Sequence, residues 1–586
     1  MRKLRRLLIL IVAGFLQSDQ PARCAGSSES DPAFADLSNE FIEGYLAWRP
    51  QTATALGLHE YDGKVTDFSR GSLDTELARL KKFDQRLAAL ETKPLGPQAR
   101  YDLRILQAAI KNELFQFEDL ASHTQNPMTY AGVIDVNIYI KRDFAPLEDR
   151  LKSIIAIEKQ TPRIMAAARA NLDESLPKPF IETAIEIASG AADFLGKDLV
   201  DAVKGITNES LKKEFQAANR ESVDQLRGYG DWLKNDKLPK AHQHYALGRG
   251  KYEKMLRQGE LIEAPSERIL EIGLKELRHE QQAFAAAANR IDPARKPIDV
   301  FTSIQKHHPT EESFLPDVRR NLEAIRQFVV GHKIVTIPSA VRAAIEETPQ
   351  YLRATSFASM DTPGPFETKA TEAYYYVTPV EKDWMPQQKE EWLTAFNTYT
   401  TDIVTIHEAY PGHYVQFLCL NASPATRLEK IFTSYAFTEG WAHYAEQMLI
   451  DEGFGASGDQ PAAAAMYRLA QSDEALLRLC RLCVSVKTHC EGMTLEDATR
   501  FFEDNCYYEH KPAYQEALRG TFDPGYLYYT VGKLEILKLR SDWQKQEGAN
   551  YSLQKFHDEL LRHGSPPIRL LRELMLKDKA AWNDIL

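Results

Sequence analysis

The segment from Thr405 to Tyr414 gathers side chains of metal-binding and acid/base type more tightly than any other part of the sequence. It contains His407, Glu408 and His413. A zinc hydrolase needs two imidazoles on one metal ion and a carboxylate beside the water that the metal activates. These residue types predict metal-assisted hydrolysis, provided that the fold brings both histidines to one face.

The spacing of the two histidines excludes a regular helix between them. In an H-E-x-x-H motif the second His stands at i+4, but here Pro411 occupies that position and His413 stands at i+6. At about 100° per residue, an unbroken helix would turn His413 away from His407. Pro411 lacks an N–H and Gly412 tolerates unusual backbone angles, so we expect a bulge or kink that returns His413 to the face of His407.

A second polar segment, Thr438 to Glu446, follows at a separation typical of a third ligand on the next helix. Its side chains Glu439, His443 and Glu446 stand at i, i+4 and i+7 and therefore share one helix face. The alternative is that the His407-Glu408 pair is only part of a solvent-exposed helix face. His-Glu pairs also occur at His59 and His279 without a second polar segment that follows them.

Together the two motifs resemble a bacterial family. H-E-A-x-P-G-H and T-E-G-W-A-x-Y-x-E are similar to the proteins grouped as domain of unknown function 885 (DUF885), related in plan to gluzincin metallopeptidases. Further matches extend along nearly the whole mature chain: Pro50 to Gly57 with His59 and Asp62, Pro365 to Pro379, Lys487 to His489, and Pro524 to Gly532.

The resemblance implies a mostly helical zinc hydrolase. His407, His413 and Glu439 would bind one Zn²⁺, and Glu408 would be the general base. The family varies at the position of His443, and Glu446 could orient a ligating imidazole. A solvent-exposed helix face is the alternative for these two residues.

Two further residues are candidate catalytic groups. Tyr529 is predicted to donate to the oxyanion, because the family carries a Tyr in this segment and because Gly532, on the same helix face, would let substrate approach. Tyr528 is its competitor, and an aromatic packing stripe is the alternative. His489, at the end of an apolar helix, either lines the cleft or is structural.

The N-terminus has the build of a signal peptide, residues 1–24, with basic residues before an apolar run that is too short to span a bilayer. We expect an exported protein, periplasmic or secreted, with a lipid anchor at Cys24 as an alternative. Without these residues the net charge changes from −11 to −15, because they carry five basic and one acidic side chain. This charge argues against a nucleic-acid partner.

Apolar residues recurring every three or four positions predict an all-α fold. We expect one catalytic domain, residues 25–586, with helical lobes at about 25–300 and 301–586 around a deep cleft. A small β element is predicted at Thr368 to Pro379, beside the metal helix, and a short strand or extended loop at Tyr130 to Ile140. Lys234 to Lys240 is predicted as a hinge or loop, and Arg427 to Asp451 as one helix.

The five cysteines after residue 24 form no dense framework. Cys480 and Cys483 lie in an apolar helical pattern without a second pair, so core packing is favoured over a metal site, with at most one disulfide.

The sequence thus predicts an exported zinc metallopeptidase that cleaves peptides or oligopeptides. The alternatives are a zinc amidase or esterase acting on a non-peptide substrate, and a cell-envelope binding protein with a relic site.

Overall fold

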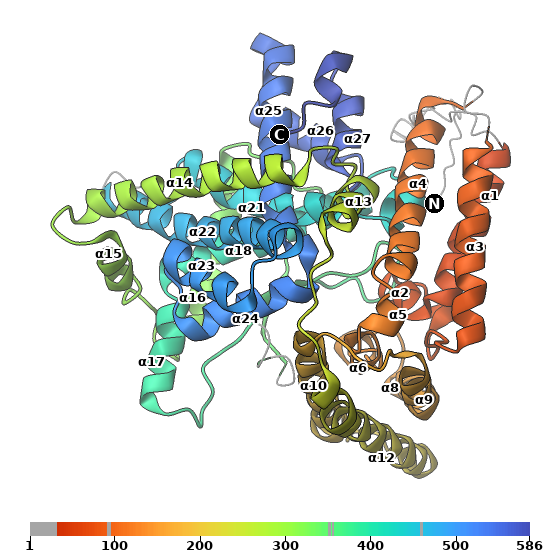
Figure 1. The fold of residues 1–586 in the computed structure, drawn as a ribbon. Coiled ribbons are helices and arrows are strands. Elements are labelled where there is room, and N and C mark those ends of the chain that lie inside the picture. The colour runs from red at the N-terminus through yellow and green to blue at the C-terminus, as the bar shows by residue number, and fades with distance from the viewer. Residues whose placement is uncertain (1–31, 91–94, 350–352, 354–356, 457–460) are drawn as a thin grey trace, which may run out of the picture.

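A computed structural model describes residues 32–90, 95–349, 353, 357–456 and 461–586. The predicted signal peptide and Cys24 lie outside these residues. The described chain is mostly helical with one small sheet, which confirms the predicted all-α class (Figure 1). None of its helices is both long and apolar enough to cross a membrane.

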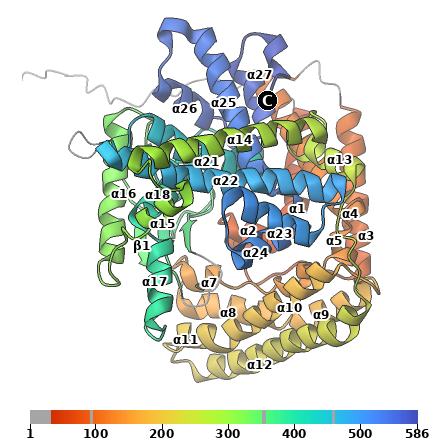
Figure 2. The same cartoon turned by 60° about the vertical axis from the view of Figure 1, so that its left-hand side comes forward.

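The N-terminal part forms two groups of helices. Its helices are α1 (Pro32–Trp48), α2 (Pro50–Ala55), α3 (Arg70–Ala88), α4 (Pro97–Glu118), α5 (Ser122–Gln125), α6 (Met128–Ala131), α7 (Ile138–Lys141), α8 (Leu147–Glu158), α9 (Thr161–Asn171), α10 (Lys178–Asp193), α11 (Leu199–Ala202) and α12 (Glu209–Trp232). The first four share one apolar core, and α6 to α12 share another, which lies at the bottom of Figures 1 and 2.

The remaining helices include α18 (Thr398–Glu408), α19 (His413–Ala422) and α21 (Tyr435–Asp451), which carry the two motifs. The others are α13 (Arg249–Gly259), α14 (Ser266–Ile291), α15 (Pro297–Ile304), α16 (Phe314–Gly331), α17 (Pro386–Ala395), α20 (Arg427–Ile431), α22 (Pro461–Glu491), α23 (Leu495–Cys506), α24 (His510–Phe522), α25 (Tyr528–Glu547), α26 (Leu553–Leu561) and α27 (Ile568–Met575).

Helix α22 is the central element of this part. Its apolar side chains are buried around its circumference, which is the pattern of a helix enclosed by neighbours. Helix α14 runs along it in both views (Figures 1 and 2), and Leu277 and Phe284 of α14 share a core with Leu476 and Leu482 of α22. Helices α14 and α15, which end at Ile291 and Ile304, therefore pack with the C-terminal helices rather than with α1 to α12.

Helices α21 and α25 cross at unusually close range. A Cβ atom added to Gly532 of α25 would lie 1.8 Å from the carbonyl oxygen of Ala436, and one added to Gly440 of α21 would lie 2.6 Å from Cα of Gly532. Two glycines let the backbones touch here, because any side chain would overlap the opposite helix. The crossing fixes the first turns of α21, which carry Glu439.

The sheet has three short strands in the order β1 (Ala344–Glu347), β3 (Tyr374–Val377), β2 (Ala358–Asp361), with β1 parallel and β2 antiparallel to β3. The predicted β element is thus confirmed. Its strand β3 is central, however, and β2 is the edge strand beside α18. The Tyr375 hydroxyl of β3 and the Thr405 hydroxyl of α18 lie 3.1 Å apart, which ties the sheet to the metal helix.

Of the strand or extended loop predicted at Tyr130 to Ile140, the structure shows the loop: residues 132–137 connect α6 and α7 without a strand. Within it the Asp135 side chain accepts a hydrogen bond from the Asn137 N–H at 2.9 Å, just before α7. Two other local predictions are wrong. Lys234 to Lys240 is helical rather than a hinge, because Lys237 folds inward and donates to the carbonyl of Asp173.

Arg427 to Asp451 is two helices rather than one. Helix α20 ends at Ile431, and α21 begins after Ser434, whose hydroxyl accepts a hydrogen bond from the Phe437 N–H at 2.9 Å. The carboxylate of Glu260 accepts two more N–H groups of this first turn, from Tyr435 at 2.9 Å and Ala436 at 3.2 Å. Burial raises the pKa of Glu260 to about 7, although these bonds favour its charged form.

All five described cysteines are free. Cys480, Cys483 and Cys506 are buried, as predicted for core residues.

Gly532→Ala should destabilise the protein by about 2 kcal/mol or more, since overpacking a rigid backbone contact costs about 1–3 kcal/mol and sometimes more. Gly190→Ala in α10 is the matched control, because no atom lies within 4 Å of its added Cβ. An exposed helical Gly→Ala change should be neutral or stabilise by about 1 kcal/mol. Thermal unfolding followed by circular dichroism measures both, and equal melting temperatures for the two variants would contradict the close crossing.

Candidate metal centre

The helix that carries His407 stops directly after the motif begins. Asn397 caps the start of α18 through a hydrogen bond from the Thr400 N–H at 3.1 Å, and the helix ends at Glu408. The Gly412 N–H then donates to the carbonyl of Ile406 at 3.0 Å, and α19 starts at His413. The break predicted at Pro411 and Gly412 is confirmed.

Gly412 is required by the tightness of this break. A Cβ atom there would lie 1.7 Å from the carbonyl oxygen of His407, which no rearrangement of a side chain could relieve. The fully buried indole of Trp441 on α21 donates to the Pro411 carbonyl at 2.9 Å. The second motif therefore holds the break in the first.

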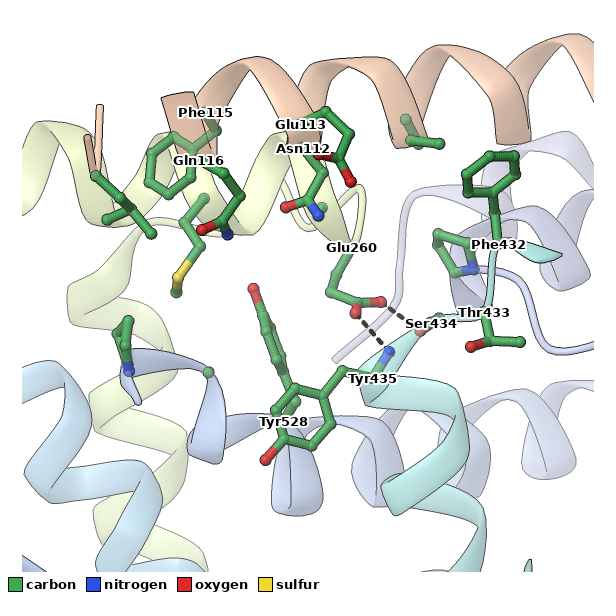
Figure 3. A pocket seen from close by; sticks show the side chains of 18 of the residues that line it. Asn112, Glu113, Phe115, Gln116, Glu260, Phe432, Thr433, Ser434, Tyr435 and Tyr528 are labelled. Atoms are coloured by element: carbon green, nitrogen blue, oxygen red, sulfur yellow. Dashed lines mark hydrogen bonds between the residues drawn. The ribbon is translucent and has the colours of Figure 1, made fainter. Parts of the chain in front are cut away.

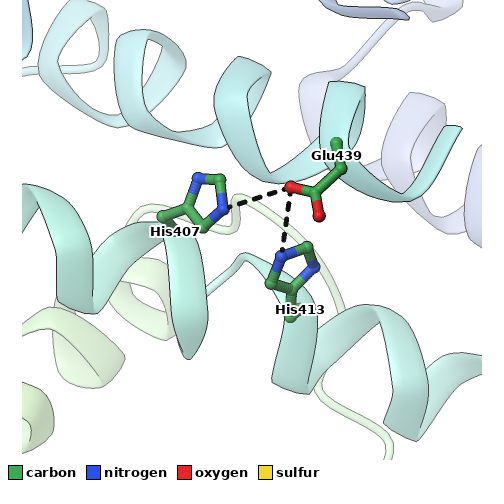
Figure 4. A group of neighbouring side chains, drawn as sticks. All are labelled: His407, His413 and Glu439. Carbon is green, nitrogen blue, oxygen red and sulfur yellow. Dashed lines mark ion pairs between the residues drawn. The ribbon is translucent and has the colours of Figure 1, made fainter. Parts of the chain in front are cut away.

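His407, His413 and Glu439 converge from α18, α19 and α21 (Figure 4). Oε2 of Glu439 lies 3.5 Å from Nε2 of His407 and 3.6 Å from Nε2 of His413, and all three donor atoms lie within 4.8 Å of one another. Bonds of about 2.0–2.2 Å to a tetrahedral ion separate neighbouring donors by about 3.3–3.6 Å. The two carboxylate distances match that spacing and exceed ordinary hydrogen bonds.

The three metal-donor atoms of the cluster have no other hydrogen bonds within the part of the chain that the structure describes. Oε2 of Glu439 is buried and accepts no hydrogen bond from the described residues. Burial acts to lower the pKa of His407, but the carboxylates of Glu439 and Glu446 raise it to about 10. Burial similarly acts to raise the pKa of Glu439, which the two imidazoles hold well below its usual value. The charge and the geometry of the cluster are those of a group that could hold a metal ion.

Glu446 joins two imidazoles behind the cluster. Its Oε1 lies 2.7 Å from Nδ1 of His407 and its Oε2 lies 3.0 Å from Nδ1 of His443, so both rings donate from Nδ1. Nε2 of His407 is consequently left to face Glu439. The guanidinium of Arg478, 3.4 Å from Oε1, overcomes burial and keeps the pKa of Glu446 well below its usual value.

Neither His443 nor Glu446 lies on an exposed face, which was the alternative for them. Both side chains are fully buried. Burial, with the nearby ammonium of Lys533, lowers the pKa of His443 to about 3, so the ring is neutral. His443 does not belong to the group of three converging donors.

Glu408 points from the end of α18 toward the sheet. Its Oε2 accepts a hydrogen bond from the backbone N–H of Met360 in the edge strand β2, at 3.0 Å. Glu408 is thereby held beside the cluster but outside the converging donor set.

A cavity of about 470 Å³ opens beside these residues. His407, Glu408, Ala358, Arg478, Arg481 and Tyr529 are among the side chains that line it. The structure therefore brings Tyr529 to the same space as the predicted base and one predicted ligand. The prediction that Gly532 lets substrate approach is wrong, because Ala436 covers Gly532 in the crossing with α21.

The structure does not bring His489 to this cavity. Its ring is buried, Nε2 lies 2.8 Å from the Gly520 carbonyl, and Nδ1 accepts from the Leu247 N–H at 3.3 Å. It stands eleven residues after Arg478 in α22, roughly 16 Å along the helix. Both ring nitrogens of His489 are hydrogen-bonded to backbone groups, which favours a structural role for this residue.

A second cavity, of about 450 Å³, lies at the N-terminal end of α21 (Figure 3). Glu260, Ser434, Tyr435 and Tyr528 line it, and none of the three converging donors does. Tyr528, the competitor of Tyr529, thus faces a different space.

The fold and the cluster define a mostly helical protein in which two histidines and a glutamate are grouped so that they could hold a metal ion. The family described as bacterial protein of unknown function (DUF885) matches residues 50–575, and the chain belongs to that family. No curated protein matches it in sequence.

Two solved structures are similar over nearly their whole length. A proposed lipoprotein of unknown function from Shewanella oneidensis has 26% identity and a TM-score of 0.75, covering 93% of this chain and 100% of its own. A proposed lipoprotein from Colwellia psychrerythraea has 17% identity and a TM-score of 0.73, covering 94% and 99%, and supports the fold alone.

Three contributors to the site carried little sequence signal. In the sequence Arg478 is one polar residue within an apolar helical pattern. Met360 contributes only its backbone N–H to the site, which no side-chain pattern can indicate. Trp441 stands within the second motif, so a search for buried hydrogen-bond donors next to the ligand candidates could have found it.

Gly412→Ala should separate His413 from His407, because the added methyl group overlaps the His407 carbonyl. The expected result is a lower melting temperature and loss of chelator-sensitive stability. Gly331→Ala, at the end of α16 with nothing within 4 Å of its Cβ, is the control. A Gly412→Ala protein with unchanged melting temperature and chelator response would contradict the tight break.

Proposed function

We propose that this protein is an exported zinc-dependent hydrolase acting on peptide bonds. The observation that carries the proposal is the spacing of three converging atoms, Nε2 of His407, Nε2 of His413 and Oε2 of Glu439, with the carboxylate of Glu408 next to them. A protein-supplied set of three donors, leaving the fourth position open, is typical of catalytic rather than structural zinc.

Under this proposal His407, His413 and Glu439 hold the ion. When bound, zinc supplies a Lewis acid that polarises a carbonyl group and makes water more acidic. Glu446 fixes the ring of His407 by accepting its Nδ1–H, and the positive charge of Arg478 keeps Glu446 ionised for that task.

Glu408 moves the proton. As a carboxylate beside the cluster it accepts a proton from the attacking water and gives it to the leaving amine. The hydrogen bond from Met360 holds Oε2 and restricts the carboxylate to one orientation. Glu408 is excluded from a ligand role in this account because it does not converge with the other three donors.

The edge strand β2 provides a way to hold a peptide. Strand β3 covers one edge of β2, and Ala358 of β2 lines the cavity beside His407. An extended peptide can add to an open strand edge through main-chain hydrogen bonds. Because the Met360 N–H already donates to Glu408, the Ala358 end of β2 is the part that faces the cavity and is left for a peptide. This feature favours a peptide over a non-peptide substrate.

Export is supported by the structural relative from Shewanella oneidensis, which is described as a proposed lipoprotein. The basic and apolar character of residues 1–24 agrees with export.

Glu408→Gln should retain one zinc ion per chain and lose at least a hundredfold in turnover of a mixed peptide pool, since general acid–base catalysis contributes about 10²–10⁴. Elemental analysis and mass spectrometry of the products measure the two quantities. Glu60→Gln, at an exposed Glu that also follows a His, is the matched control and should change neither. A Glu408→Gln protein that cleaves peptides normally, or that loses its metal, would refute the assigned role.

Tyr529→Phe should lower kcat by about a hundredfold with little change in KM, because an oxyanion donor acts mainly in the transition state. Tyr528→Phe is the control, since that hydroxyl is buried without a partner and faces the other cavity. Unchanged kcat for the Tyr529→Phe enzyme with intact zinc would remove Tyr529 from the mechanism.

A further inference from the structure

Three arginines surround Tyr529 in the cavity beside the cluster. Their guanidinium carbons lie 5.8 Å (Arg478), 5.1 Å (Arg481) and 5.9 Å (Arg519) from the centre of the Tyr529 ring. All three line the cavity together with His407 and Glu408. Arg478 and Arg481 are more than nine-tenths buried.

Two of the arginines are anchored on one side and have a donor to spare. Arg481 uses Nε and Nη2 for a two-point contact with Glu516, at 2.8 Å each. Arg519 uses the same two atoms for Asp523 and the hydroxyl of Tyr435. Nη1 of both residues therefore makes none of these bonds to the described chain, whereas the unpartnered Nε of Arg478 is buried.

This pattern is typical of an anion site. Like charges repel strongly where water is scarce, so clustering three guanidinium groups requires compensating anions. Four carboxylates already pair with these arginines: Glu446, Glu474, Glu516 and Asp523. Glu446 and Glu474 also line the cavity, so the guanidinium groups and carboxylates alternate around it. The Nη1 groups of Arg481 and Arg519 can donate to one more carboxylate, for which the planar guanidinium is well suited.

The arginines lie in the same cavity as His407 and Glu408. Arg478 contacts Glu446, which in turn holds the ring of His407. A carboxylate bound among the arginines would therefore belong to the same substrate molecule whose scissile carbonyl faces His407 and Glu408.

We propose that this cavity is a carboxylate-binding subsite and that the substrates are peptides carrying a carboxylate close to the scissile bond. The proposal rests on the peptidase function proposed above and names its substrate class. Two sources have this chemistry: the free C-terminus of a short peptide and the side chain of Asp or Glu.

The first test compares three peptides of equal length: tetra-alanine with a free C-terminus, its C-terminal amide, and an amidated peptide with one Glu. The wild-type protein should cleave a carboxylate-bearing peptide with a KM at least tenfold below that of the neutral amide. Preference for the first or the third peptide identifies the source. Equal KM values for all three would overturn the subsite.

Arg519→Gln should raise KM at least tenfold for the carboxylate peptides and leave the neutral amide unchanged, as expected for the loss of one charge-assisted contact. Arg500→Gln is the matched control, because Arg500 also pairs with acids of its own helix but lies exposed on α23. Arg481→Lys, which keeps the charge and loses the two-point geometry, should raise KM in the same selective way. Unchanged KM values in both cavity variants would overturn the proposal.

A binding measurement separates the subsite from the hydrolytic function. Calorimetric titration of chelator-treated wild-type protein uses the same three peptides, and the amide of tetra-alanine should bind at least tenfold more weakly than the better of the two carboxylate-bearing peptides. Arg519→Gln should remove the difference. Carboxylate-selective binding without cleavage of any peptide would sustain the subsite and refute the peptidase function, whereas equal binding of all three peptides would overturn the subsite.

Discussion

The hydrogen bond from the Trp441 indole to the carbonyl of Pro411 links the two motifs on which the site depends. It fixes the point where α18 ends and α19 begins, and so sets where His413 lies relative to His407. Trp441 stands two residues after Glu439 on α21. The same helix therefore supplies the third donor and the clamp that aligns the other two.

The position of α21 is in turn set by backbone contacts. At one face, Gly440 and Gly532 allow α25 to approach until the two helices touch. At its N-terminal end, the Glu260 carboxylate and the Ser434 hydroxyl satisfy N–H groups that a buried helix start would otherwise leave unpaired. A helix held from two sides can keep Glu439 within the narrow spacing that a metal ion requires.

Charge is balanced across the site in successive layers. Glu439 faces two imidazoles, Glu446 lies behind His407, and Arg478 lies behind Glu446. Arg478 also borders the cavity, where Arg481 and Arg519 lie around Tyr529. Arg478 thus has two positions in the site: it supports the ring of His407 through Glu446, and it lines the cavity.

Much of the site could be predicted from sequence. The Pro-Gly pair and the i+6 spacing indicated a helix break, and the family resemblance singled out Glu439. The burial of Glu446 could not be predicted, since its partner Arg478 lies on another helix 32 positions later. The strand beside α18 could not be predicted either: the strong β propensity of Tyr374 to Val377 marks the central strand, whereas β2, with the weaker sequence Ala358–Asp361, forms the edge next to α18.

The most direct measurement is X-ray diffraction from crystals of the zinc-loaded protein at wavelengths above and below the zinc absorption edge. The account predicts a single anomalous peak in the space bounded by Nε2 of His407, Nε2 of His413 and Oε2 of Glu439. A fully loaded crystal with no peak there, or with zinc bound elsewhere, would contradict it.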